Sequence, residues 1–206
     1  MLHVAEAGRT HVPDTVLRTM FAARKDVFVD LLKWDVPVVE HRYEIDQFDD
    51  EHASYLILVD GDGRHLGSTR LLPTSRPHIL DSLYAELCDG TPPTGPTTLE
   101  ITRFCLDRRL RAAERRAVRD TLVVGLVDHA LAHGITCYTA VAEFGWFQQI
   151  LAFGWRCRPL GLPRSIEGAT LAAMRIEIDG RTPALLATAG IRAQADLLHC
   201  PQRAAA

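Results

Sequence analysis

Residues 55–72 constrain the fold of this chain most strongly, because they read as two strands joined by a tight turn. An apolar run at 55–59 is followed by the sequence DGDGR and by a second run at 66–72. Asp-Gly pairs favour the positive φ angles that short hairpin turns require. The segment therefore predicts a β-hairpin, and the fold must contain at least one antiparallel pair of strands.

The rest of the chain alternates between helical and extended patterns. Helices are expected over 14–33, where apolar residues recur at every third or fourth position, and over 112–133, which Gly134 can end. The further elements expected are strands at 99–106, 135–142 and 170–178, a loop at 89–97, a short helix at 147–153, a turn at 159–163 and a closing helix at 183–198. This order predicts an α/β (α+β) fold class, with a mixed β-sheet and helices on both of its faces.

Length and composition point to a single globular domain. The chain has 206 residues, of which 47% are hydrophobic and 24% charged, and a single core serves chains of this size. We expect one domain over 1–206, with 191–206 as a partly ordered tail. No apolar stretch is long enough for a membrane helix, and the N-terminus has no apolar signal core. We therefore expect a cytoplasmic protein that does not interact with membranes.

The cysteines and histidines give no indication of a metal site. The five cysteines are well spread and form no CxxC pair, so they are interpreted as reduced packing residues. The nine histidines show no ligand spacing on which a site could be argued. No metal is expected.

Charge is unevenly distributed, although the net charge is only −3. Residues 44–51 contain five acids, whereas residues 103–119 contain seven arginines and two acids. Guanidinium groups pair well with phosphates and carboxylates. The small net charge and the absence of a nucleic-acid-binding motif argue against nucleic acid as a partner.

Three of the acids, Glu44, Asp46 and Asp49, lie within six residues of one another. Solvated surface loops can have the same composition. Arg24 on the first predicted helix and Arg70 on the second strand of the hairpin are candidate countercharges. A cluster of carboxylates and arginines can bind a zwitterionic or cationic substrate.

Glu100 lies in the sequence LEITRF, inside a predicted strand. A partly desolvated carboxylate is a candidate general base, and the alternative is a glutamate on an edge strand that faces water. Strict alternation along a strand places Glu100 and Thr102 on one face and Arg103 on the other. Joint action of Glu100 and Arg103 at one site therefore requires a bulge in the strand.

Four fragments, in order and with compatible spacing, resemble the acyl-homoserine-lactone synthases, the autoinducer synthases of bacterial quorum sensing. The resemblance runs from about residue 1 to 180. The fragments are Arg24-x3-Phe28-x5-Trp34, Glu44-Ile45-Asp46-Gln47-Phe48-Asp49, Ser68-Thr69-Arg70-Leu71 and Glu100-Ile101-Thr102-Arg103-Phe104.

This resemblance implies a fold similar to that of the N-acetyltransferases, with the mixed sheet between helices and a V-shaped cleft for an acyl thioester. It also implies an acyltransferase reaction. The amine of S-adenosylmethionine attacks the thioester, and the methionine carboxylate then closes onto its own side chain, releasing 5'-methylthioadenosine. S-adenosylmethionine is a substrate in this reaction, and no cofactor is expected.

The resemblance also implies roles for individual residues. Glu100 would be the base, Asp46, Asp49 and Arg70 would hold the amino-acid part of S-adenosylmethionine, and the N-terminal segment would close over this substrate. Trp34, which could otherwise be a core residue, would then contact the adenine. The catalytic residues implied are Glu100, Asp46, Asp49, Arg70 and Arg103, and the substrate-binding residues are Arg24, Phe28, Trp34, Thr102, Phe104, Thr139, Val141, Ala142 and Trp146.

The acyl donor is either acyl-CoA or an acyl-carrier protein. The arginine cluster could meet the phosphates of the first or the acidic helix of the second, and charge alone does not separate them. The sequences EFGWFQQ at 143–149 and PLGLP at 159–163 resemble the smaller branch of the family, which takes branched or aryl acyl groups from coenzyme A. The docking residues expected are Arg108, Arg109, Arg111, Arg115, Arg116 and Arg119.

Two other functions remain open from the sequence. One is a general N-acyltransferase of similar fold that acylates another amine and turns over without S-adenosylmethionine. The other is a non-catalytic thioester-binding module, which would tolerate Glu100→Gln.

Overall fold

The computed structural model describes residues 1–6 and 12–198. The chain divides into two compact units whose segments alternate along the sequence. The first unit consists of Met1–Arg70, Arg103–Gly125 and Arg192–Ala206, and the second of Leu71–Thr102 and Leu126–Ile191. The expectation of a single domain over 1–206 stays a prediction, and residues 199–206 of the expected tail lie outside the described residues.

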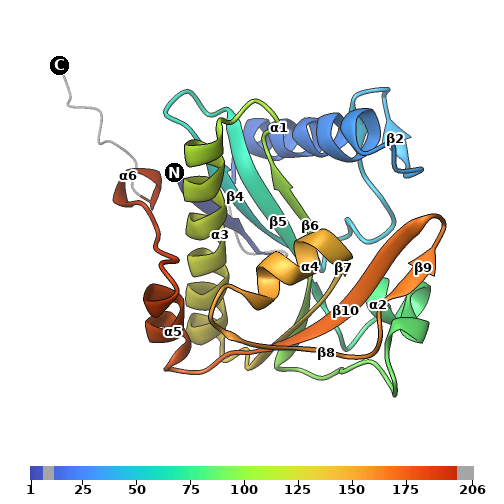
Figure 1. The fold of residues 1–206 in the computed structure, drawn as a ribbon. Helices are drawn as coiled ribbons and strands as arrows, with labels where there is room; N and C mark the ends of the chain where they lie inside the picture. The colour runs from blue at the N-terminus through green and yellow to red at the C-terminus, as the bar shows by residue number, and fades with distance from the viewer. Residues whose placement is uncertain (7–11, 199–206) are drawn as a thin grey trace. The chain divides into compact units, whose positions relative to one another are not determined.

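The first unit holds the predicted hairpin. Strands β4 (Ser54–Val59) and β5 (His65–Pro73) are neighbours in the sheet, and β1 (Leu2–Ala5) pairs antiparallel with β4 (Figure 1). In the turn between β4 and β5, the amide of Asp60 donates to the carbonyl of Arg64 at 3.0 Å, and Gly63 has φ +77°. The turn chemistry of the sequence therefore correctly predicted this pair of strands.

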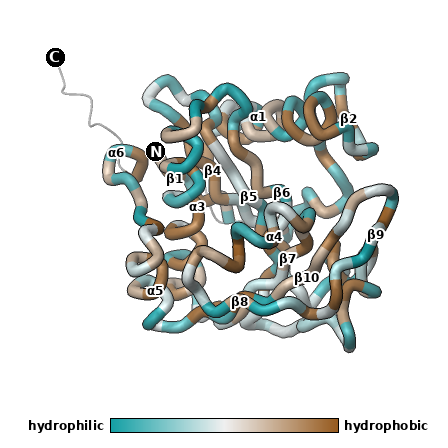
Figure 2. The backbone as a smooth tube through the Cα atoms, viewed as in Figure 1, coloured by the Kyte–Doolittle hydropathy of each residue, from teal (hydrophilic) through white to brown (hydrophobic). Residues whose placement is uncertain are grey.

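Apolar residues of β4 form the centre of the first unit. Leu56, Ile57 and Leu58 are fully buried, and their run is drawn in brown in Figure 2. The first half of helix α3 (Ala112–His133) packs closely against β5, since a Cβ at Gly67 would lie 2.7 Å from Cγ1 of Val118. A glycine in a strand interior often marks such a close approach.

Around this core, the first unit carries short elements that position charged side chains. Helix α1 (Asp14–Arg24) continues into a π-helical segment, η1 (Lys25–Leu31), and packs against β3 (Tyr43–Glu44). Strand β3 pairs antiparallel with β2 (Val38–Val39). The predicted helix over 14–33 thus ends in a π-helical turn, a form that is frequent at functional sites.

The second unit is built on a mixed sheet. The first half of β6 (Thr98–Leu106) pairs in parallel with β7 (Cys137–Glu143), and this ladder ends at Ile101 and Ala140. Strand β10 (Ala169–Glu177) pairs antiparallel with β7, β8 (Arg156–Pro159) and β9 (Arg164–Ile166). The helical elements of this unit are α2 (Ile79–Leu83), η2 (Ala85–Leu87), the end of α3, α4 (Phe144–Leu151) and α5 (Thr182–Thr188). The predicted fold class, an α/β chain with a mixed sheet and flanking helices, is confirmed.

The predicted closing helix is wrong in its extent. Helix α5 ends at Thr188, and Gly190 follows with φ +81°, a left-handed conformation that commonly ends helices. A separate short helix, α6, covers Ala195–Leu198. Among the described residues, no helix combines the length and the apolar character that crossing a membrane requires.

Candidate active site

Three carboxylates and three arginines of the first unit form one buried network of ion pairs. Arg24, the last residue of α1, donates from Nε to Glu44 at 2.5 Å and from Nη1 and Nη2 to Asp49 at 2.7 and 2.8 Å. The countercharge expected at Arg24 is therefore present. We call Arg24, Glu44, Asp46, Asp49, Arg70 and Arg103 the carboxylate–arginine network.

The other two arginines complete this network. Arg70 donates from Nη1 and Nη2 to Asp46 at 2.6 and 3.0 Å, and its Nη1 lies 2.8 Å from Asp49. Arg103 donates from Nη2 to Glu44 at 3.0 Å and to Asp46 at 2.7 Å. Formal charges in the network balance, which is what burial of charged groups requires.

The turn at 46–49 explains why the acids point inward. The amide of Asp49 donates to the carbonyl of Asp46, and the Asp46 amide donates back to the Asp49 carboxylate at 2.9 Å. The amide of Phe48 donates to the Asp46 carboxylate at 2.8 Å. Backbone and side chain thus fix both carboxylates, and the alternative of a solvated loop is wrong for Glu44, Asp46 and Asp49.

Burial and neighbouring charges shift the ionisation of this network. Burial opposes the charge on Asp49, but the hydrogen bonds and charge of Arg24, together with Arg70, outweigh it and hold the pKa of Asp49 well below its ordinary value. Burial and the Asp49 charge both raise the pKa of Tyr55, whose hydroxyl donates to Asp49 at 2.8 Å. Tyr55 had been interpreted only as a strand residue, and no sequence signal marked it as a partner of Asp49.

An aromatic pair lies beside Arg103. The rings of Phe28 and Trp34 are stacked with centroids 4.7 Å apart, and the guanidinium of Arg103 lies 5.6 and 5.7 Å from the two centroids. Phe28 is buried, but 36% of Trp34 is exposed. Trp34 is therefore not a core residue.

Arg103 has an unusual backbone conformation within strand β6. Its φ is +50°, a left-handed conformation that is rare for a side chain of this size. The backbone of the strand therefore departs from regular extended geometry at this residue. Thr102 before it is buried, and Phe104 after it is half-buried.

Glu100 lies in the second unit and is fully buried. Its Oε2 accepts the backbone N–H of Ile79 at 2.8 Å, and its Oε1 accepts that of Leu80 at 3.0 Å. The alternative of an edge glutamate facing water is wrong. Sequence reasoning missed these two partners, since nothing in the sequence marked a helix at 79–83.

The predicted acyl-wall residues of β7 do not all share one face. Thr139 is the cross-strand partner of Glu100 and is fully buried, and its hydroxyl has no hydrogen-bond partner among the described residues. Val141 follows on the same face by the alternation of a strand, whereas Ala142 lies on the other. Trp146 on α4 makes an edge-to-face contact with Phe153, with centroids 5.8 Å apart.

The arginine cluster of the first unit is partly neutralised. Arg109 pairs with Asp107 at 2.6 Å, and Arg119 pairs with Asp120 at 2.6 Å. The exposed members are Arg108, Arg109, Arg111 and Arg116, and the half-buried members are Arg115 and Arg119.

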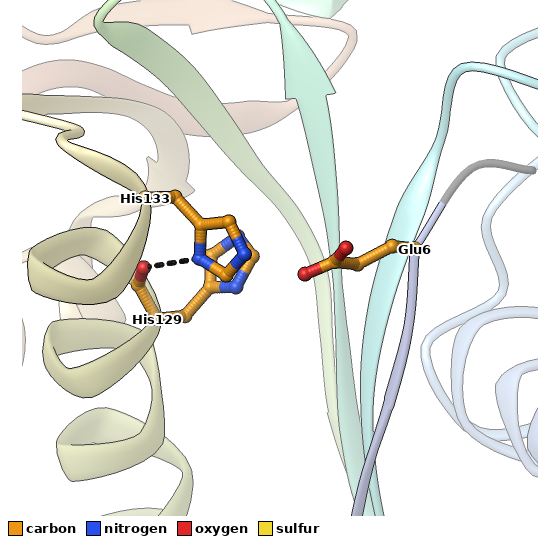
Figure 3. Close-up of side chains that lie close together, drawn as sticks. All are labelled: Glu6, His129 and His133. Carbon is orange, nitrogen blue, oxygen red and sulfur yellow. Dashed lines mark hydrogen bonds between the residues drawn. The ribbon is translucent and has the colours of Figure 1, made fainter. Parts of the chain in front are cut away.

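Two histidines stack near the end of α3, in the second unit. His129 and His133 are one helical turn apart, their ring centroids are 4.3 Å apart, and Nδ1 of His133 lies 2.8 Å from the carbonyl oxygen of His129 (Figure 3). Glu6, also drawn there, belongs to the first unit. Sequence reasoning had not singled out this pair, and the expectation that the chain holds no metal stays a prediction.

Comparison with known proteins gives consistent matches over most of the chain. The family model described as autoinducer synthase matches residues 9–184. An isovaleryl-homoserine lactone synthase of Bradyrhizobium diazoefficiens is 29% identical over 183 residues, which cover 88% of this chain and 82% of that protein. An acyl-homoserine-lactone synthase of Ralstonia nicotianae is 30% identical over 190 residues, covering 89% and 92%.

Solved structures agree with these sequence matches. A CoA-dependent acyl-homoserine lactone synthase, BjaI, solved with S-adenosylmethionine and isopentyl-CoA, superposes with a TM-score of 0.84 at 27% identity over 96% of both chains. An acyl-CoA N-acyltransferase from Pseudomonas aeruginosa superposes with a TM-score of 0.59 at 15% identity, over 85% of this chain and 97% of that one. At that identity the second match shows the fold alone, which is the N-acetyltransferase-like fold expected from the sequence.

Proposed function

This chain belongs to the autoinducer synthase family, and we infer that it synthesises an N-acyl-L-homoserine lactone from S-adenosylmethionine and an acyl thioester. It is an acyltransferase. The methionine amine attacks the thioester carbonyl and displaces the thiol. The carboxylate of the acylated methionine then attacks the side-chain carbon bonded to the sulfonium, which closes the lactone and releases 5'-methylthioadenosine.

The observation that supports a site for S-adenosylmethionine is the carboxylate–arginine network. Its charges balance, and most of its members are buried, but the side chains of Asp46 and Arg103 are 5% and 11% exposed. We assign Asp46 to the ammonium group and Arg103 to the carboxylate of the substrate. The fully buried Arg24, Glu44, Asp49 and Arg70 then hold these two side chains in place. Orientation of this kind contributes to catalysis by presenting the amine in a reactive geometry.

We assign the stacked pair Phe28 and Trp34 to the adenine. Trp34 is partly exposed, and its ring is a planar apolar group of the kind that a purine stacks on. Arg103 lies against the same two rings. The amino-acid and adenine parts of one substrate would therefore be bound by adjacent side chains of the first unit.

We assign Glu100 as the group that takes the proton from the amine, directly or through a water molecule. The amine must lose a proton before it attacks, and a carboxylate on a rigid strand can accept it. The Glu100 side chain is held in place, since its two oxygens accept the backbone N–H groups of Ile79 and Leu80. Phe104 and backbone donors of the distorted strand at Arg103 are assigned to the thioester.

We propose coenzyme A as the carrier of the acyl group and a branched or aryl acid as the group itself. The supporting facts are the matches to an isovaleryl-homoserine lactone synthase and to a CoA-dependent synthase solved with isopentyl-CoA. Thr139, Val141, Ala142 and Trp146 are the wall residues proposed for the acyl chain. The exposed arginines Arg108, Arg109, Arg111 and Arg116, with Arg115 and Arg119, would meet the CoA phosphates, and an acyl-carrier protein is the other donor to test.

The experiment is product analysis by mass spectrometry. Purified protein is incubated with S-adenosylmethionine and a panel of acyl-CoA and acyl-carrier-protein thioesters, including branched and aryl acids. An acyl-homoserine lactone formed together with 5'-methylthioadenosine is the expected result. Turnover of a thioester with another amine and without S-adenosylmethionine would contradict the proposal and favour a general N-acyltransferase.

Two variants make this experiment specific to the site. Asp46→Asn should damage binding or placement of S-adenosylmethionine and lower turnover, whereas Arg64→Ala, at an exposed position in the hairpin turn, should leave turnover unchanged. Equal turnover in both variants would contradict the assignment of the carboxylate–arginine network. A cytoplasmic location is part of the proposal, because the intracellular pools of both substrates are the source that the reaction needs.

A further inference from the structure

Glu100 holds a segment that is distant in sequence. Its two carboxylate oxygens accept the N–H groups of Ile79 and Leu80, the first two residues of α2. The first N–H groups of a helix have no partner within the helix. The carboxylate therefore supplies acceptors that α2 lacks, through two hydrogen bonds of the stronger, charge-assisted kind.

The start of α2 is fixed to β6 at this point. The neighbouring His78 is held locally, since its backbone N–H donates to the Asp81 carboxylate at 2.9 Å. Glu100 connects α2 to the sheet, although it lies 21 residues after Ile79 and 20 residues after Leu80 in the chain. A change in the length or acceptor pattern of residue 100 therefore alters this connection between α2 and β6.

Leu80 of α2 belongs to a core cluster that also packs against a proposed acyl-wall residue. Leu80, Leu87 and Ala173 form a core cluster, and Val141 is one of the partly buried residues packed against it. Val141 is a proposed wall residue for the acyl chain and lies on the same face of the sheet as Thr139 and Glu100. Leu80 is thus one of the three core residues of the cluster against which Val141 packs.

The other end of this segment is fixed by the sequence PLGLP. The amide of Asp89 donates to the carbonyl of Leu160 at 2.9 Å. A Cβ at Gly161 would lie 2.6 Å from the carbonyl oxygen of Leu87. Residues 79–89 are therefore held at their start by Glu100 and at their end by Leu160 and Gly161.

We propose that Glu100 is also a positioning residue that sets acyl-group selectivity, because its two hydrogen bonds to α2 fix Leu80 within the core cluster against which Val141 packs. This inference rests on the proposed function. The Glu100 carboxylate would then have two roles, proton transfer and the positioning of α2. Proton transfer from the amine is common to all acyl donors, whereas packing at Val141 affects donors according to the size and branching of the acyl group.

Selectivity is the measurement that distinguishes the two roles. The ratio of kcat/KM for isovaleryl-CoA to kcat/KM for octanoyl-CoA is compared between the wild type and Glu100→Gln. Loss of the base alone lowers both values by the same factor and leaves the ratio unchanged. An amide offers only one acceptor oxygen, so one N–H of α2 loses its partner, and we expect the ratio to change by about tenfold, the size of effect that a methylene-sized change in an apolar pocket produces.

Two further variants change the same segment without touching the carboxylate. Leu80→Ala and Gly161→Ala should change the ratio while retaining measurable turnover. Asp46→Asn is the matched control, because it acts on the amine substrate and should lower turnover with both donors by one factor. A ratio that stays at the wild-type value in Glu100→Gln, Leu80→Ala and Gly161→Ala overturns the inference.

Hydrogen exchange keeps the inference testable if Glu100→Gln is inactive. Amides of residues 79 and 80 should exchange faster in this variant than in the wild type, while those of α3 should not change. Unchanged exchange at 79 and 80 would contradict the positioning role. Failure of the wild type to form any lactone would instead contradict the proposed function, so the two failures are distinguishable.

Discussion

Arg24 and Asp49 face each other as a two-pronged ion pair, in which Nη1 and Nη2 of the guanidinium donate to the two carboxylate oxygens at 2.7 and 2.8 Å. Arg24 ends α1, and Asp49 closes the turn at 46–49. Parallel hydrogen bonds of this kind fix the relative orientation of both groups. The pair therefore joins α1, which continues into the π-helical segment that contains Phe28, to the turn that contains Asp46.

Removal of Arg24 should destabilise the protein strongly. Arg24→Ala leaves Glu44 and Asp49 buried without their partner, and breaking a buried pair in this way costs about 3–5 kcal/mol of the free energy of unfolding. Urea unfolding followed by circular dichroism measures the loss. Arg116→Ala, at an exposed position of α3, is the control and should change the free energy by less than about 0.5 kcal/mol. Equal stability of the two variants would contradict a structural role for the pair.

His65 should make the protein less stable in mild acid. Burial lowers the pKa of His65 to about 4, against an opposing effect of Asp107, whereas in the unfolded chain the imidazole titrates near its ordinary value. Between pH 6.5 and 4 the unfolded state therefore binds more protons than the folded state, so stability falls as the pH is lowered through this window. The loss should approach about 3 kcal/mol.

The measurement is the free energy of unfolding at pH 7 and at pH 5 for the wild type and His65→Gln. Nε2 of His65 lies 2.8 Å from the hydroxyl of Ser68. The side-chain amide of the glutamine in the variant can replace the imidazole as the polar partner of this hydroxyl. The difference between the two pH values should be smaller in the variant. His52→Gln, at a half-buried histidine whose side chain is 39% exposed, is the control and should leave that difference as in the wild type. An identical pH dependence in all three proteins would contradict the prediction.

The elements that the sequence predicted correctly are those with a local signal. The hairpin follows from the turn chemistry at 60–64, and α3 follows from 22 residues of helical pattern ended by Gly134. Strand β1 was missed because four residues carry too little periodicity, and its partner β4 lies more than 50 residues further along. Helix α2, with five residues, is stabilised by Glu100 from a distant strand, which no local pattern reveals.

The site was predicted only in part for a related reason. Glu44, Asp46 and Asp49 share one short segment, so their clustering was visible in the sequence. Their pairing with Arg103 was not, because Arg103 lies 59 residues beyond Glu44 and reaches it through a positive φ within a strand. Residue type and spacing therefore identified the charged groups, whereas the tertiary fold determines which of them meet.

The turn between β2 and β3 should be a site at which a glycine stabilises the protein. Glu40 and His41 have φ values of +53° and +55°, and the amide of Arg42 donates to the carbonyl of Val39 at 3.0 Å. Two consecutive positive φ values are typical of the two-residue hairpin turns that favour Asn-Gly. His41→Gly should therefore raise the free energy of unfolding by about 0.5–1 kcal/mol, since it relieves strain at an exposed position.

Thermal unfolding of His41→Gly and Arg42→Gly tests this expectation. Arg42 is also exposed, but its φ is not positive, so a glycine there adds freedom to the unfolded chain. It also removes the contact of the Arg42 guanidinium with the Tyr43 ring, 5.4 Å from the centroid, and should destabilise the protein. Opposite shifts of Tm in the two variants are expected. Destabilisation by both would contradict the interpretation of this turn.

Trp34 should contribute to the binding of S-adenosylmethionine through stacking. Its ring stacks on that of Phe28, and the residue is 36% exposed. Stacking of a base on an aromatic side chain is worth about 1–3 kcal/mol, so Trp34→Ala should weaken binding about tenfold. Trp34→Phe retains a planar ring and should lose less affinity, and Leu32→Ala, at a nearby exposed position, should bind as the wild type does.

Isothermal titration calorimetry with S-adenosylmethionine measures the affinity of all three variants. Wild-type affinity in Trp34→Ala would contradict the assignment of the adenine to this ring. The assignment of Asp46 and Arg103 to the amino-acid part is tested separately, by Asp46→Asn in the same assay.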